Sequence, residues 1–211
     1  MVRQRLTRAE QSAQTRAELM DSARRLFLRR GFHAASLELV AEEAGFTIGA
    51  VYSRFGSKAD LFLAILDERI DQLVAEVAKV AADAQPVAAH AELLAGRHMA
   101  LLEREREWFP LVVEFWSHAA RDQRLRREFG ARHERLVAAY AGLIEADYAR
   151  LGLPLPLATE VLARAVVAMG NGVALERLAD PARVPDGLLA TMAVAFLRGA
   201  AAGGPAAERR S

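Results

Sequence analysis

Apolar residues recur every three or four positions along almost the whole chain, the spacing that places them on one face of an α-helix. No segment alternates apolar and polar residues with β-branched enrichment, as a half-buried strand would. Proline, glycine and Asp-Pro steps divide the pattern into segments. The sequence therefore predicts an all-α protein, with helices over residues 9–30, 37–44, 48–54, 57–77, 88–105, 110–121, 124–151, 156–179 and 185–200.

Capping residues mark the ends of the first four predicted helices. Gly31 is placed to end the first helix, and Ser36 and Thr47 are placed to begin the second and third. Ser57, with Asp60 three residues later, is the expected start of the long fourth helix. A helix of that length spans ~30 to 40 Å, enough to connect two domains.

Residues 37–52 have the length and residue types of a helix-turn-helix. Ala41 is small enough to let two helices cross closely, and Gly45 can adopt the positive φ of a tight turn. Ile48, Val51 and Phe55 are expected to bury the inner face of the third helix. The residues left to face outward are Thr47, Gly49, Ala50, Tyr52, Ser53 and Arg54.

This outward face suits the major groove of DNA. Gly49 and Ala50 would let the helix approach closely, while Tyr52, Ser53 and Arg54 carry hydrogen-bonding groups. Ser36 and Ser57–Lys58, at the starts of the second and fourth helices, would offer amides and an ammonium to phosphates. Two short helices and a glycine turn also occur in proteins that bind no nucleic acid.

The segment from about Thr15 to Asp67, with its core Val-Ala-Glu-Glu-Ala-Gly-Phe-Thr-Ile-Gly-Ala-Val-Tyr and the later Phe-Gly-Ser-Lys-Ala-Asp-Leu-Phe, resembles the DNA-binding domain of the tetracycline-repressor (TetR) family. The resemblance covers about a quarter of the chain. It implies an all-helical, homodimeric, cytoplasmic regulator, most often a repressor that a small ligand releases from palindromic operator DNA. Arg54 departs from the family, whose members often carry His there. The DNA-contacting positions that it implies are Ser36, Thr47, Gly49, Tyr52, Ser53 and Lys58.

Charge and composition narrow the function classes. The net charge is +1, yet the first 30 residues hold eight arginines against Glu10, Glu18 and Asp21, so this end is the one to test for phosphate contacts. The chain has no cysteine, which excludes disulfides and thiolate metal sites. No apolar run is long enough to span a membrane. We expect a cytoplasmic protein without a cofactor.

The C-terminal part is expected to bind a ligand. Half of the fourteen aromatic residues lie between Trp108 and Tyr148, and aromatic walls suit a drug-sized cavity, although ordinary core packing would also place aromatics there. Asn171, between two glycines, either contacts a ligand or marks a helix irregularity. The preferred pocket candidates are Met99, Leu102, Trp108, Val112, Phe115, Trp116, Tyr140 and Met169.

Two further features concern metals and assembly. Glu114, His118 and Asp122 share a helix face but lack a third strong ligand at helical spacing, so an ion-paired surface stripe is favoured over a metal site. The last two helices are apolar around much of their circumference. They form either a four-helix interface with a second copy or a buried pair within one chain.

The predicted organisation is a DNA-binding domain over residues 1–60, a helical effector-binding and dimerisation domain over 61–202, and a disordered tail over 203–211. Two other classes of protein are the alternatives to a ligand-responsive regulator. A helical enzyme is disfavoured because no nucleophile–base pair, phosphate loop or HExxH motif is present. A nucleoid-type protein that binds DNA without sequence preference is the second, which a footprint confined to one palindrome would exclude.

Overall fold

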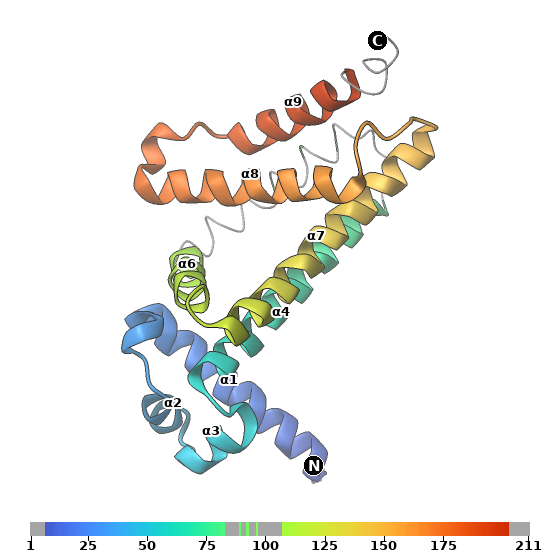
Figure 1. Cartoon of the computed structure of the whole chain (residues 1–211). Helices are drawn as coiled ribbons and strands as arrows, with labels where there is room; N and C mark the ends of the chain where they lie inside the picture. The colour runs from blue at the N-terminus through green and yellow to red at the C-terminus, as the bar shows by residue number, and fades with distance from the viewer. Residues whose placement is uncertain (1–6, 83–88, 90–91, 93–95, 97–106, 203–211) are drawn as a thin grey trace, which may run out of the picture. The chain divides into compact units, whose positions relative to one another are not determined.

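The computed structural model describes residues 7–82, 89, 92, 96 and 107–202. Within this part of the chain every regular element is helical and no strand occurs, which confirms the all-α prediction (Figure 1). The predicted tail over 203–211 and most of the predicted helix over 88–105 lie outside the described residues. The elements are α1 Arg8–Ala34, α2 Leu37–Ala44, α3 Ile48–Phe55, α4 Lys58–Ala81, α6 Trp108–Ala119, α7 Gln123–Leu151, α8 Thr159–Ala179, the 3-10 helix η1 Pro181–Arg183 and α9 Leu188–Ala202.

The predicted helix ends differ from the observed ones by a few residues. At Gly31, φ is 76° and ψ is 169°, so the first helix is interrupted where the sequence predicts, but helical turns resume and carry α1 to Ala34. α8 begins at Thr159 rather than at 156, because the Leu-Pro-Leu-Pro-Leu segment before it stays extended or bent. A proline-rich segment resists helix formation at the residue before each proline.

Contacts divide the chain into two compact units. The first contains Met1–Arg69 and Leu111–Phe129, and the second contains Ile70–Pro110 and Gly130–Ser211. The C-terminal part of α6 and the start of α7 therefore group with the N-terminal helices, although they follow them by some fifty residues in sequence. The predicted boundary after residue 60 stays a prediction.

The first unit has an aromatic core. Phe27, Phe32, Phe62 and Phe115 are all almost completely buried. The rings of Phe62 and Phe115 stack with centroids 4.2 Å apart, and Phe32 meets both edge-on at 5.5 and 5.0 Å. Burying one such side chain stabilises a fold by about 1.5–3 kcal/mol, so this cluster holds α1, α4 and α6 together.

The second unit is built on α7, α8 and α9 with the C-terminal part of α4. One cluster joins Val137, Ile144 and Tyr148 of α7 to Leu162 of α8 and Leu197 of α9. Val77 and Val80 of α4 pack against Leu143 of α7. Figure 1 shows α8 and α9 running side by side, joined through η1. Among the described residues, no helix has the length and apolar character needed to cross a bilayer.

Candidate nucleic-acid interface

α2 and α3 form the predicted helix-turn-helix, and their caps are those expected from the sequence. The Ser36 hydroxyl accepts a hydrogen bond from the Leu39 amide at 3.3 Å, and the Thr47 hydroxyl accepts one from Ala50 at 3.2 Å. Gly45 ends α2 with φ 71° and ψ 27°, a left-handed conformation that glycine adopts without strain. Ala41 is buried, as a close crossing of the two helices requires.

α3 is divided into a buried face and an exposed face. Val51 and Phe55 are 0% and 6% exposed, whereas Tyr52 is 51% exposed, as predicted from the helical spacing. The prediction for Ile48 was wrong, because this side chain is 36% exposed. It occupies the first position of α3, one turn before Val51 and next to the exposed Thr47, where the core of the unit has already ended.

The polar residues of α3 differ in how freely they face solvent. Thr47, Gly49, Tyr52 and Ser53 are exposed. Arg54 is only half-exposed, and its guanidinium folds back along the helix to donate to the Ala50 carbonyl at 3.0 Å. Its Nε is buried without a partner among the described residues. Arg54 is therefore less available to DNA in this structure than the sequence suggests.

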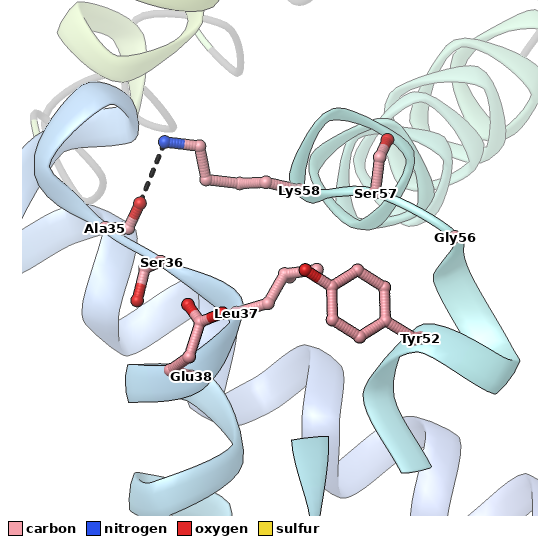
Figure 2. Close-up of a pocket in the computed structure, with 8 residues that line it drawn as sticks. All are labelled: Ala35, Ser36, Leu37, Glu38, Tyr52, Gly56, Ser57 and Lys58. Atoms are coloured by element: carbon pink, nitrogen blue, oxygen red, sulfur yellow. Dashed lines mark hydrogen bonds between the residues drawn. The ribbon is translucent and has the colours of Figure 1, made fainter. Parts of the chain in front are cut away.

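A shallow hollow of about 260 Å³ lies beside α3 (Figure 2). Tyr52 reaches from α3 toward the start of α2, and Lys58 extends from the start of α4 toward Ala35. The starts of α2 and α4 both border the hollow, so two helix N-termini with positive partial charge line it. Its lining residues are Ala35, Ser36, Leu37, Glu38, Tyr52, Gly56, Ser57 and Lys58.

Lys58 makes contacts that the sequence did not predict. Its ammonium donates to the carbonyls of Phe32, His33 and Ala35 at 2.7, 3.0 and 2.8 Å, and it lies 4.6 Å from the centre of the Phe32 ring. Burial lowers the pKa of Lys58, while the negative charge of Glu114 opposes this shift. All three N–H donors of the Lys58 ammonium have partners inside the protein, so a hydrogen bond to a phosphate would have to replace one of them. A direct phosphate contact by Lys58 therefore stays a prediction.

The start of α4 is fixed by a second set of polar contacts. The Ser57 hydroxyl accepts from the Asp60 amide at 3.1 Å and donates to its carboxylate at 2.6 Å, so the predicted cap is present. Arg124, at the start of α7, donates to the other carboxylate oxygen of Asp60 at 2.8 Å. Residues from both α4 and α7 thus hold one border of the hollow in place.

Much of the positive charge of α1 is neutralised within the protein. Arg24 donates to Glu68 at 2.7 Å, and Arg25 and Arg29 both pair with Glu43 of α2. These arginines are less free to bind phosphates than their number suggests. Arg3 and Arg5, the first two of the basic end, lie outside the described residues.

The predicted ligand-site residues fall in both units, apart from Met99 and Leu102, which lie outside the described residues. In the first unit, Phe115 is completely buried in the aromatic core, Trp116 is 44% exposed and stacks on Phe129, and Val112 is half-buried. In the second, burial raises the pKa of Tyr140 to about 12, Met169 packs against Val173 and Leu189, and Trp108 is half-buried. The ligand site stays a prediction.

The carboxylates considered for a metal site have backbone partners. Glu114 accepts from the amides of Phe32 and His33, and Asp122 accepts from Leu125. Over the described ranges, no three His, Asp or Glu side chains gather in a way that would hold a metal ion. The prediction of an ion-paired surface stripe was wrong for Glu114, because its carboxylate accepts hydrogen bonds from backbone amides of α1.

α8 passes through Asn171 as regular α-helix, which removes the helix irregularity as an explanation for that residue.

Comparison with known proteins covers both halves of the chain. Residues 19–65 match the model for bacterial regulatory proteins of the tetR family, and residues 87–202 match the model for the C-terminal part of BetI-type transcriptional repressors. YfiR of Bacillus subtilis, an HTH-type transcriptional regulator, is 25% identical over 166 residues, which is 78% of this chain and 80% of YfiR.

Other matches are shorter or more distant. The activator FasR of Mycolicibacterium smegmatis is 39% identical over 62 residues, but these are only 29% of this chain and 28% of FasR. The crystal structure of FadR from Bacillus subtilis with stearoyl-CoA shares the fold, with a TM-score of 0.70 at 14% identity, over 89% of this chain and 98% of that one. Since one family model matches the N-terminal helices and a second matches more than half of the chain, this protein belongs to the TetR family of bacterial transcriptional regulators.

Proposed function

We propose that the protein is a homodimeric repressor that binds palindromic operator DNA through α3 and leaves it when a small effector binds the C-terminal domain. The observation that carries this proposal is the division of α3. Val51 and Phe55 anchor one face in the core, and the opposite face presents Tyr52 with half of its surface exposed. The BetI-type match over residues 87–202 favours a repressor, because the match to an activator is limited to the N-terminal part.

The exposed face of α3 has the chemistry needed to read bases. Gly49 has no side chain and nothing but the Thr47 hydroxyl, at 3.9 Å, near the position of a Cβ, so the helix backbone can approach the groove closely. Tyr52 and Ser53 supply hydroxyl groups, and Thr47 adds another at the helix start. Because Ile48 is exposed, its side chain is free to meet a thymine methyl group.

The hollow beside α3 is the expected place for a backbone phosphate. It lies between the starts of α2 and α4, whose dipoles favour an anion. The Lys58 ammonium adds a positive charge at its border even though its hydrogen bonds are internal. The exposed Glu38 works against binding, since its negative charge lies on the same hollow. The phosphate should therefore bind nearer to Ser57 than to Glu38.

Dimerisation through α8 and α9 is supported by apolar side chains that remain exposed in one protomer. Val161, Leu175 and Leu178 of α8 are 54%, 46% and 45% exposed, and Met192 of α9 is 36% exposed. Leu162 and Val167 of α8 and Leu197 of α9 pack inside the chain. One side of these helices therefore packs within the chain, and a second copy would cover the outer face only.

An effector would be a small molecule with a substantial apolar part. FadR, which has the same fold, was crystallised with stearoyl-CoA. The candidate side chains on α6, α7 and α8 are aromatic or aliphatic, which is the matching character. A coupling of ~1–3 kcal/mol between effector and DNA would weaken operator binding about 5- to 150-fold.

Selection of bound duplexes from a random DNA pool tests this function. We expect one palindrome whose half-site centres are ~34 to 36 Å apart. Tyr52→Ala should weaken binding of that duplex about ten-fold or more without changing the fold, because the side chain faces solvent. Leu153→Ala, which truncates a side chain of equal exposure (52%) on the α7–α8 connection, is the control and should bind normally. Failure to enrich any sequence would refute the proposal.

A further inference from the structure

Residues 32–35, which end α1 and form its connection to α2, are held by two oppositely charged side chains from other helices. The amides of Phe32 and His33 donate to Glu114 of α6, at 3.0 Å to one carboxylate oxygen and 2.9 Å to the other. The carbonyls of the same two residues, and that of Ala35, accept from Lys58 of α4. Both the N–H groups and the carbonyls of this short segment are therefore bonded by side chains that are distant in the sequence.

The approach of Glu114 requires glycine at position 31. A Cβ on Gly31 would lie 2.9 Å from one oxygen of the Glu114 carboxylate. This distance is shorter than the contacts that Cβ atoms make in folded proteins. The positive φ of Gly31, 76°, turns the chain so that the next two amides point at the same carboxylate. Glu114 is 30% exposed, so these bonds are only partly screened by water.

The connection leads directly into the DNA-facing surface. Ser36, the N-cap of α2, follows His33 by three residues and borders the hollow together with Ala35. Phe32 is anchored by Phe62 and Phe115, and Phe115 is the neighbour of Glu114 in α6. A change at Glu114 therefore acts on the start of α2 through a few backbone atoms.

We propose that Glu114 is a positioning residue for DNA binding: its carboxylate fixes the Phe32 and His33 amides and thereby sets the start of α2 and the placement of α3. This proposal rests on the proposed function. Glu114 belongs to the stretch matched by the BetI-type C-terminal model, yet its bonding partners belong to the helix that precedes the helix-turn-helix. The sequence match that identifies the DNA-binding region ends at residue 65 and does not include it.

Amide hydrogen exchange measured by NMR on the full-length protein tests the structural part. In Glu114→Ala, the Phe32 and His33 amides should exchange about ten-fold faster, and the Leu39 amide, which donates to Ser36, should also exchange faster. Glu114→Gln keeps one acceptor oxygen and should give intermediate rates. Glu145→Ala removes an exposed carboxylate of α7 and should change none of these amides. Unchanged Leu39 exchange in Glu114→Ala would overturn the proposal.

Binding to the duplex recovered from the random pool tests the functional part. Glu114→Ala should bind about ten-fold more weakly at a temperature where circular dichroism shows full helicity, with Glu114→Gln between it and the wild type. If Glu114→Ala does not fold, Glu114→Gln alone decides. Wild-type affinity in both variants, with Tyr52→Ala still defective, would overturn the positioning role and leave the proposed function intact. If Tyr52→Ala binds normally, the proposed function fails, and Leu39 exchange still decides whether Glu114 positions α2.

Discussion

Replacing Lys58 by methionine should destabilise the first unit by about 3 to 3.5 kcal/mol. The substitution keeps most of the apolar stem but removes the ammonium that binds the carbonyls of Phe32, His33 and Ala35. A typical hydrogen bond contributes a net ~1 kcal/mol and one from a charged donor ~1.5–3 kcal/mol, so ~1 kcal/mol for each of the three bonds is a conservative value. Loss of the cation above the Phe32 ring adds a further ~0.5 kcal/mol.

Urea unfolding followed by circular dichroism, at equal protomer concentrations, measures this effect. With a slope of ~2–3 kcal/mol per M, a loss of about 3 to 3.5 kcal/mol lowers the midpoint by ~1 to 1.75 M. Lys79→Met is a matched control, since Lys79 is the only other lysine in the sequence. Its side chain is 66% exposed and pairs with Glu76 at 2.7 Å, so its removal should change stability by less than ~0.5 kcal/mol.

The alternative is that the Lys58 ammonium binds a DNA phosphate rather than the carbonyls of Phe32, His33 and Ala35. In that case Lys58→Met would keep the wild-type urea midpoint, and the salt dependence of operator binding would become shallower by about 1 in logarithmic slope. An ammonium engaged inside the protein predicts lower stability and little change in slope. The pair of measurements therefore separates the two roles.

Two further substitutions test local features of the fold. Gly45→Ala should lower the free energy of unfolding by about 1 kcal/mol because φ is 71° there, whereas Gly45→Asn should cost less; since no atom lies within 4 Å of an added Cβ, equal losses would mean that backbone strain is not the cause. Asp122 has its pKa lowered, chiefly by the hydrogen bond from the Leu125 amide at 2.9 Å. Its stabilising effect is therefore present above the ordinary pKa of aspartate and is lost as the pH falls through the lower pKa of the folded state. Asp122→Asn should retain neutral stability but lose less on acidification, and urea midpoints at pH 7 and about pH 3 that fall in parallel would contradict this.

Local signals predicted most of the fold and the two faces of α3. Caps at Ser36, Thr47 and Ser57 satisfy backbone amides within three residues, and Gly45 must adopt a positive φ wherever the chain lies. Burial of Val51 and exposure of Tyr52 follow from helical spacing alone. These features depend on neighbours in the chain, which a sequence displays directly.

Features that depend on distant partners escaped prediction. Nothing near Lys58 indicates that its ammonium meets carbonyls 23 to 26 residues earlier, and nothing near Glu114 points to amides 81 and 82 residues earlier. Ile48 was misplaced because spacing gives the direction of a side chain but not the edge of the core. The division of α8 into faces that pack internally and faces that stay exposed depends on α7 and α9 in the same way.

The bond between α6 and the end of α1 bears on the construction of hybrid regulators. Grafting residues 1–60 of this chain onto the C-terminal part of another regulator transfers Gly31, Phe32 and Lys58 but leaves Glu114 behind. The grafted head would then meet whatever residue the recipient carries at that position. A hybrid should retain full operator affinity only where donor and recipient agree on a carboxylate there, so compatible pairs can be chosen by inspecting one site outside the transplanted segment.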